Sequence, residues 1–548
     1  MSRWTRSVPI YVSVLLIGAL LPTGVRLAGA SATPLVSRPI VWVSGQDSGQ
    51  VFITKGTTIL KTFDFAHGTP AGTPVVPGVG SPTPGLDVAS PKPHLITFSP
   101  DARFAYVSFQ NTNPGRVAVI NTATRQVQTI ISIPTSLPTT SSPRVTQAKP
   151  SADGTFLLVG EVGPPGVIVK VDVDEAHLTW TPGTQLAAPA NQGPACIEFS
   201  PVDGHAYYDS SLSPMLGVGV LDPATMTLGA FYPTIGDPQC GFHDPIDVGG
   251  TPTVIVTDSG TPTGGVNPDL GHVHALNTAT DAFTEFSFSP FFAKNLHDNW
   301  PVQLEPVGAP TSDSPSIVYG SDRDSDILKQ INIATGAIND LTMNPPNVPV
   351  NGRGAIDTLD GSGDTVFAAM KETGDLGIVD GFNHQTFLHL HNPDPSCSDP
   401  SSPNFHKCFV VHAVTVQPLE HTTTTLVVQP ASSAFGSSVT FTATVSPATP
   451  NPDLSPTGTI SFFLDGQATA VATVPLGANG TARFSTSGLG AGHHTVVARY
   501  SGDTNFFPSQ SAPATATVTA GTTLSGNQGT IIVPSGTSVL LLNATVAG

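Results

Sequence analysis

Charged residues are scarce in this chain of 548 residues. Asp, Glu, Lys and Arg make up 11% of it, with 21 basic residues against 39 acidic ones. A typical soluble domain carries about 25% charged residues, and a coiled coil needs many more Glu, Lys, Leu and Arg. Hydrophobic residues account for 39%, which excludes a disordered solvating chain. The acidic excess repels phosphate backbones and anionic lipid surfaces, so we expect no nucleic-acid partner.

Long apolar runs are absent after the first 32 residues. Those residues have a basic start, a short apolar run over 10–21 and small-x-small cleavage sites around Ala30. This layout predicts a secretory signal peptide over residues 1–32, and the run is short for a membrane anchor. Cleavage removes three basic residues and no acid, which leaves 18 against 39, a net charge of −21. We expect a mature chain without a membrane span that is secreted, extracellular or at the cell surface.

Cysteine is also rare, and the even number in an exported chain predicts two disulfides. Cys397 and Cys408 close a small loop rich in Ser, Pro and Asp, so we pair them, which leaves Cys196 with Cys240. A metal site is the alternative, but no C-x-x-C spacing supports it. The sequence also lacks a G-x-S-x-G elbow and a Walker or dinucleotide glycine motif.

What the chain has in abundance is Gly (54) and Pro (53), together with an internal repeat. An apolar segment ending in Asn or Asp recurs, and its clearest copies continue as Thr-Ala-Thr or Pro-Ala-Thr. Its Asn/Asp positions are 121, 172, 222, 277, 332 and 380, which are 51, 50, 55, 55 and 48 residues apart. Repeats of about 40–50 residues are typical of propeller blades or solenoids.

The sequence of each repeat predicts strands joined by tight turns. The turns are Ser99-Pro-Asp101, Ser151-Ala-Asp-Gly154 and Ser200-Pro-Val-Asp-Gly204, each between two apolar runs. A further strand follows at 127–133, so four strands per repeat describe a propeller blade. Six copies are countable, and we assemble a seventh from three strands within 41–65 and a lone first strand at 412–418. Closure by both ends leaves no open edge.

The segments Phe98-Ser-Pro-Asp-Ala-Arg-Phe-Ala-Tyr-Val107 and Val117-Ala-Val-Ile-Asn-Thr-Ala-Thr124 resemble the YVTN-type β-propeller repeat. The resemblance covers roughly residues 38–418. It implies a seven-bladed β-propeller and says little about function, since propellers host many activities.

After Pro418 the sequence becomes rich in Thr, Val, Ala and Ser. Residues 439–445 alternate with period two, and about seven short strands within a hundred residues indicate an immunoglobulin-like β-sandwich over 422–520. Gly-Thr-Ile-Ser-Phe462 and Tyr500-Ser-Gly-Asp-Thr-Asn-Phe506 resemble bacterial Ig-like repeats, which usually act as spacers or adhesion stalks. Residues 521–548 read as a short β-rich tail or an incomplete repeat. The predicted fold class is all-β.

Candidate ligands gather where first strands of blades begin, at the mouth of the central channel. His94 and His412 occupy matching positions, and His243 lies within one residue of the equivalent place. Three imidazoles there suit copper or zinc, and some related propellers use His in this region for metal. Thr146 and Ala195 fill two equivalent places, so ordinary channel-lining histidines are the alternative. His272-Val-His274 reads as a plain surface pair.

Two acidic patterns are weaker. Asp322 to Asp326 alternate as in a calcium loop, but Ile327 stands where an EF-hand needs Gly, so only a looser calcium turn or a solvated loop fits. Scattered carboxylates read as turn-forming rather than as an acid/base pair: Asp244, Asp247, Asp357 and Asp360.

These patterns favour a secreted or cell-surface binding or structural protein without enzyme activity. A propeller recognition face would be displayed by the Ig-like spacer to a protein, glycan or cell-wall ligand. The alternative is a propeller enzyme of the lactonase or hydrolase type, or a copper redox protein, with its site at the channel. An enzyme should gather several acids or histidines at the channel mouth, whereas a scaffold need not.

Overall fold

The computed structural model describes the chain in stretches separated by gaps. These are residues 39–46, 48–66, 91–134, 144–163, 166–200, 202–211, 214–234, 236–238, 246–248, 251–258, 272–285, 296–302, 317–322, 327–332, 338–343, 356–362, 365–370, 374–380, 384–390, 411–448 and 454–520. The described residues form strands and turns without a helix, so none of them belongs to a helix that could cross a membrane. The prediction of an all-β chain is confirmed.

The described residues between 39 and 416 form seven four-stranded antiparallel sheets. In order from the first strand of each sheet to its last, they are β28 (Val411–Val416), β1 (Ile40–Gly45), β2 (Gln50–Lys55) and β3 (Thr58–Asp64); β4 (Lys92–Phe98), β5 (Phe104–Gln110), β6 (Gly115–Asn121) and β7 (Gln126–Ile133); β8 (Arg144–Pro150), β9 (Phe156–Val162), β10 (Val167–Asp174) and β11 (Thr179–Ala187); β12 (Pro194–Phe199), β13 (Ala206–Ser210), β14 (Gly217–Asp222) and β15 (Thr227–Pro233); β16 (Ile246–Val248), β17 (Thr251–Asp258), β18 (His272–Asn277) and β19 (Ala282–Glu285); β20 (Leu296–Val302), β21 (Ile317–Asp322), β22 (Ile327–Asn332) and β23 (Ile338–Thr342); and β24 (Ile356–Ser362), β25 (Thr365–Met370), β26 (Asp375–Asp380) and β27 (His384–His389).

Repeated turn residues explain why several of the sheets fold in the same way. In the turn between β4 and β5, Ser99 Oγ donates to Asp101 Oδ1 at 2.7 Å, and Phe104 N–H donates to Ser99 Oγ at 3.0 Å. Between β6 and β7, Asn121 Oδ1 accepts from Thr124 N–H at 2.8 Å. Short polar side chains that bond the backbone two or three residues onward favour tight turns. The repeat found in the sequence is therefore a repeat of turn chemistry.

Neighbouring sheets pack face to face through apolar side chains. One cluster, which includes Tyr106 and Val159, lies between the sheets β4–β7 and β8–β11; another, which includes Tyr207 and Val254, lies between β12–β15 and β16–β19. The predicted closure is confirmed, because β28 pairs with β1 and so joins the two ends of the propeller in one sheet. Closure removes the exposed strand edge that an open array would leave.

Gly160 shows how closely two neighbouring sheets approach each other. A Cβ at this position of β9 would lie 2.9 Å from the carbonyl oxygen of Ala195 and 3.2 Å from that of Pro194, both on β12 of the next sheet. Gly160→Ala should therefore lower the free energy of unfolding by about 1–3 kcal/mol, as overpacking does. Urea denaturation followed by circular dichroism measures it. Gly183→Ala on β11 is the control, because its Cβ would meet nothing closer than 3.5 Å. Equal effects of the two substitutions would contradict the close approach.

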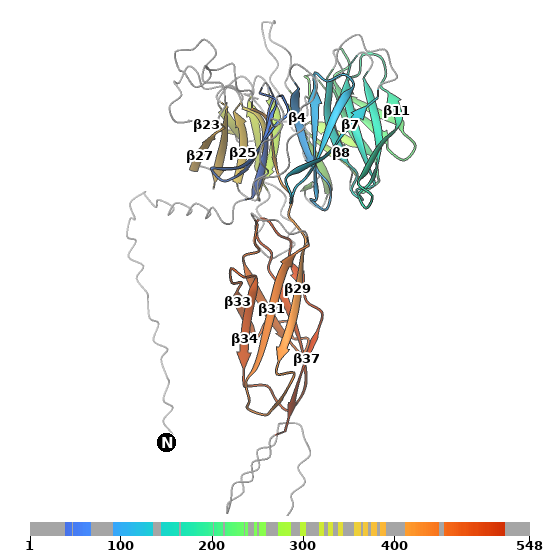
Figure 1. The fold of residues 1–548 in the computed structure, drawn as a ribbon. Coiled ribbons are helices and arrows are strands. Elements are labelled where there is room, and N and C mark those ends of the chain that lie inside the picture. Colours follow the sequence, from blue (N-terminus) through green and yellow to red (C-terminus); the bar gives the residue numbers. More distant parts are fainter. Residues whose placement is uncertain are drawn as a thin grey trace, which may run out of the picture.

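The C-terminal part is a two-sheet β-sandwich (Figure 1). One sheet holds three strands and the other six: β29 (Thr422–Gln429), β31 (Val439–Pro447) and β34 (Thr481–Thr486); and β30 (Ser432–Ala434), β37 (Ala514–Thr519), β35 (Gly492–Tyr500), β32 (Thr459–Leu464), β33 (Ala472–Pro475) and β36 (Ser509–Gln510). The alternation of Val439–Val445 places Phe441 inward, where its ring lies 6.4 Å from that of Phe462 and 6.0 Å from that of Phe484.

A short linker after β28 ties the propeller to the sandwich. Trp42 Nε1–H donates to Gln417 Oε1 at 3.1 Å, and Gln417 Nε2–H donates to Glu420 Oε1 at 3.2 Å. Glu420 N–H in turn donates to the carbonyl of Asn505 in the sandwich at 2.8 Å. Buried apolar residues of the first two sheets and of the sandwich belong to one cluster. The sandwich is thus attached through directed contacts and not only through a tether (Figure 1).

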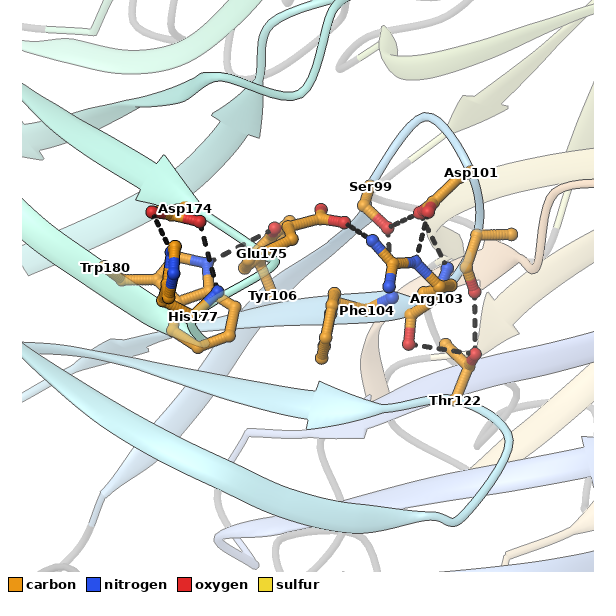
Figure 2. Close-up of polar contacts among 11 residues, drawn as sticks. Ser99, Asp101, Arg103, Phe104, Tyr106, Thr122, Asp174, Glu175, His177 and Trp180 are labelled. Atoms are coloured by element: carbon orange, nitrogen blue, oxygen red, sulfur yellow. Dashed lines mark hydrogen bonds and ion pairs between the residues drawn. The ribbon is translucent and has the colours of Figure 1, made fainter. Parts of the chain in front are cut away.

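The turn between β4 and β5 borders this junction. A pocket of about 270 Å³ lies between that turn and the linker, lined by Asp101, Ala102, Arg103, Thr122, Glu420, His421 and Ala448. Figure 2 shows Arg103 lying between Asp101 of its own turn and Glu175 of the β10–β11 turn, which joins two neighbouring sheets. Burial opposes ionisation of Asp101, but hydrogen bonds from Ser99 and Arg103 hold the pKa of that carboxyl below its usual value. The sandwich therefore meets the face of the propeller that carries these turns.

Candidate functional site

The predicted ligands His94 and His412 lie at the other ends of the first strands, away from the sandwich. His94 is near the start of β4 and His412 near the start of β28. Hydroxyl groups hold these strands side by side: Thr415 Oγ1–H donates to the carbonyl of Ile96 at 3.0 Å, and Ser44 Oγ–H donates to the carbonyl of His94 at 2.7 Å. These bonds cross from one sheet to the next and fix the height at which the two imidazoles meet.

The structure brings His94 and His412 into contact. Their ring centroids are 4.1 Å apart with 38° between the ring planes, and the two residues are 7% and 4% exposed. His94 Nδ1 lies 2.9 Å from the carbonyl oxygen of Thr146, which can only accept, so Nδ1 carries the proton. His412 Nδ1 lies 2.6 Å from Asp357 Oδ2. His412 Nε2 is buried and has no hydrogen-bond partner among the described residues.

This arrangement fixes the tautomers of the two imidazoles. A histidine whose Nδ1–H bonds a carboxylate or a backbone carbonyl presents the lone pair of Nε2, which is the usual arrangement of a metal-binding histidine. The same lone pair accepts an N–H or O–H of an organic ligand. His412 therefore presents a buried Nε2 lone pair next to His94, and the third predicted ligand, His243, lies outside the described residues.

Asp357 is a functional candidate that the sequence reading assigned to a turn. It is 0% exposed in β24 and orients His412, so the turn-forming interpretation is wrong for this residue. Asp360 has a structural role instead, because its Oδ2 accepts from Val416 N–H at 2.7 Å. The structure does not describe the side chains of Asp244, Asp247 and Asp322, nor residues 323–326 of the segment that suggested calcium.

The sequence analysis did not identify Glu161 as a candidate, and it did not predict that His272 and His274 are buried. Glu161 in β9 is 1% exposed, both its carboxylate oxygens are without a hydrogen-bond partner among the described residues, and burial raises its pKa to about 7. His272 and His274 are 6% and 5% exposed, so the interpretation as a surface pair is wrong. The sequence signal for Glu161 was a charged residue inside the apolar run 156–162. No sequence pattern indicated that His272 is buried.

The structure describes only one of the four cysteines in the disulfide prediction, Cys196. Cys196 lies in β12 and is 1% exposed, and no described cysteine has a free thiol. Cys240, Cys397 and Cys408 lie outside the described residues, so both pairings stay predictions.

Comparison with known protein families identifies a match in the C-terminal part of the chain. Residues 426–546 match the model of the bacterial Ig-like domain (group 3), and the match extends beyond the last described residue, 520. A search of curated protein sequences finds no match.

Solved structures of several other proteins are similar to the chain at low sequence identity. The chain is similar to hydrazine synthase of Kuenenia stuttgartiensis (17% identity, TM-score 0.39, 57% of this chain and 80% of that one) and to virginiamycin B lyase from Staphylococcus aureus (15%, 0.38, 55% and 85%). It is also similar to the Dos1 propeller (13%, 0.40, 66% and 85%). The seven sheets themselves, closed by β28 on β1, carry the propeller assignment. The chain is thus a β-propeller followed by a bacterial Ig-like domain of group 3.

Proposed function

We propose that this protein is an exported binding protein whose recognition face is the channel mouth around His94 and His412. The predicted signal peptide supports export, and the two predicted disulfides suit an oxidising compartment. The Ig-like domain serves as a spacer, and the ligand is a glycan or cell-wall component.

One observation carries the proposal, namely the course of β28. This strand begins beside His412 and ends at the linker to the sandwich. A strand of its length or that of β4 spans about 20 Å at about 3.3 Å per residue. The two histidines and the attachment of the spacer are therefore at opposite ends of these strands, so the sandwich does not cover the end that carries the histidines. Figure 1 shows the sandwich on one face of the propeller.

A binding experiment on the full chain tests the proposal. The probes are purified peptidoglycan and a printed array of bacterial glycans. We expect binding that falls at least tenfold in the double variant H94A/H412A and stays unchanged in His177→Ala, whose exposed imidazole lies in the β10–β11 turn on the other face. Binding that survives H94A/H412A would refute the channel mouth as the recognition face. Absence of binding to every probe would refute the ligand class.

The second candidate function is a copper protein with its site at the same mouth. The observation that favours it is the bonding of both Nδ1 atoms, to Thr146 and Asp357, which leaves Nε2 of His412 free to ligate. Titration of the full chain with Cu(II) and electron paramagnetic resonance distinguishes the two candidates. A stoichiometric signal abolished by H94A/H412A supports the copper site, and an unchanged signal contradicts it.

A further inference from the structure

A second group of metal-ligating side chains lies in the fifth sheet, away from the channel histidines. Asp258 is the last residue of β17, and His272 is the first residue of β18. The antiparallel register pairs Asp258 with His272 and Val256 with His274. Paired residues share a face, and so do residues two apart along a strand. The hairpin thus places all three polar side chains on one face of the sheet.

The three side chains converge on one another. His272 Nδ1 lies 3.0 Å from Asp258 Oδ1, and His274 Nε2 lies 2.8 Å from Asp258 Oδ2. One ligand atom from each residue lies within 4.8 Å of the other two. Ligands at about 2.1 Å from a tetrahedral ion are about 3.4 Å apart. The separations between these atoms are therefore in the range expected of ligands to one ion.

The rings are oriented for joint coordination. The centroids of His272 and His274 are 6.0 Å apart with 46° between the planes, so the rings do not stack on each other. The ring of His274 instead lies against Phe283 of β19, with centroids 4.8 Å apart and 17° between the planes. This packing holds the imidazole with Nε2 directed at Asp258. Preformed orientation of ligands lowers the cost of binding.

Burial gives a reason for a cation at this place. Asp258, His272 and His274 are 0%, 6% and 5% exposed. A buried carboxylate is costly unless a positive charge compensates for it. A divalent ion that takes the lone pairs of His272 Nδ1 and His274 Nε2, with each ring proton on its other nitrogen, compensates the carboxylate.

We propose that Asp258, His272 and His274 bind a divalent transition-metal ion, and that zinc is the ion they fit best. Two imidazole nitrogens and one carboxylate oxygen suit zinc and its neighbours in the first transition row, whereas magnesium and calcium prefer oxygen ligands. Three protein ligands leave the fourth position of a tetrahedral zinc ion to water or to a ligand group. The site is separate from the channel histidines and does not depend on the proposed recognition face.

Zinc binding to the full chain tests this site. The protein is stripped with EDTA and titrated with zinc chloride alone against a chromophoric chelator, and bound zinc is counted by mass spectrometry after dialysis. We expect one equivalent that His94 and His412 do not provide, so that H94A/H412A retains it. Asp258→Asn, which preserves the shape of the side chain, should weaken zinc binding at least about 10- to 100-fold, since loss of even an outer partner costs that much.

A measurement on the wild-type protein tests the site even if the Asp258→Asn variant does not fold. Zinc should slow the reaction of His272 and His274 with diethyl pyrocarbonate, read by peptide mass mapping, and leave the exposed His177 as reactive as before. The absorption of tetrahedral Co(II) should appear in the wild type and vanish in Asp258→Asn. No zinc equivalent in the wild type, equal zinc affinity of Asp258→Asn, or loss of the equivalent in H94A/H412A alone would each overturn the proposal.

Discussion

Trp42→Ala should lower the free energy of unfolding of the propeller by about 3–5 kcal/mol, the range for removing a buried tryptophan. Trp42 is 0% exposed in β1. Its ring lies 6.2 Å from that of Phe63 in the same sheet and 5.6 Å from that of Phe98 in the next. Its Nε1–H also holds Gln417 in the linker. The substitution removes apolar contacts between two sheets and a hydrogen bond across the closure.

Two controls separate the causes of the Trp42 effect. Trp42→Phe keeps a ring but loses the indole donor, so we expect a smaller loss of about 1–2 kcal/mol. Val427→Ala on the sandwich should change stability by no more than about 0.5 kcal/mol, because Val427 is 52% exposed. Urea denaturation followed by far-ultraviolet circular dichroism gives the values for the propeller transition. A loss below about 1 kcal/mol for Trp42→Ala would contradict a stabilising role of Trp42 in the closure.

Glu161→Gln should stabilise the protein above neutral pH by up to about 3 kcal/mol and have little effect in mild acid. Burial raises the pKa of Glu161 from 4.5 to about 7 in the folded chain. Below pH 4.5 the carboxyl is protonated in both states. Between 4.5 and 7 the unfolded chain releases the proton and the folded chain keeps it, so stability falls as pH rises. A shift of about 2.5 units corresponds to about 3 kcal/mol.

The readout for Glu161 is the difference in unfolding free energy between variant and wild type at several pH values. This difference should grow from acid to neutral pH and level off above it, because glutamine has no proton to lose. Glu285→Gln is the matched control, since Glu285 is exposed in β19 and its substitution should change stability by no more than about 0.5 kcal/mol. A difference for Glu161→Gln that does not depend on pH would contradict the claim that burial disfavours ionisation of the Glu161 carboxyl in the folded chain.

The propeller could be predicted from the sequence because the interactions that form its turns join residues close together in the chain. The side chains of Ser99, Asp101 and Asn121 bond the backbone within a few residues, so each repeat carries the signal for its own turns. The closing strand was also predictable, since residues 412–418 match the first strand of the second sheet at His, Thr and Pro.

The arrangement of the candidate sites was less predictable because it depends on packing over long separations. His412 meets Asp357 through the contact between first strands of neighbouring sheets, 55 residues apart. Asp258 meets His272 through the register of a hairpin whose strands are separated by residues 259–271. Neither the height of a residue in the channel nor such a register follows from strand periodicity. The sequence therefore indicated the histidines but missed the carboxylates that orient them.

The pairing of β1 with β28 imposes an order on folding. Trp42 and Gln417 are 375 residues apart, so the first sheet lacks its innermost strand until the end of the propeller has been made. A chain that emerges from its N-terminus exposes the unpaired edge of β1 throughout that time, and such edges promote aggregation. The other sheets complete themselves from strands that follow one another along the chain. Ring closure is consequently the slow, non-local step of assembly, and the linker to the sandwich takes its place only when that step is complete.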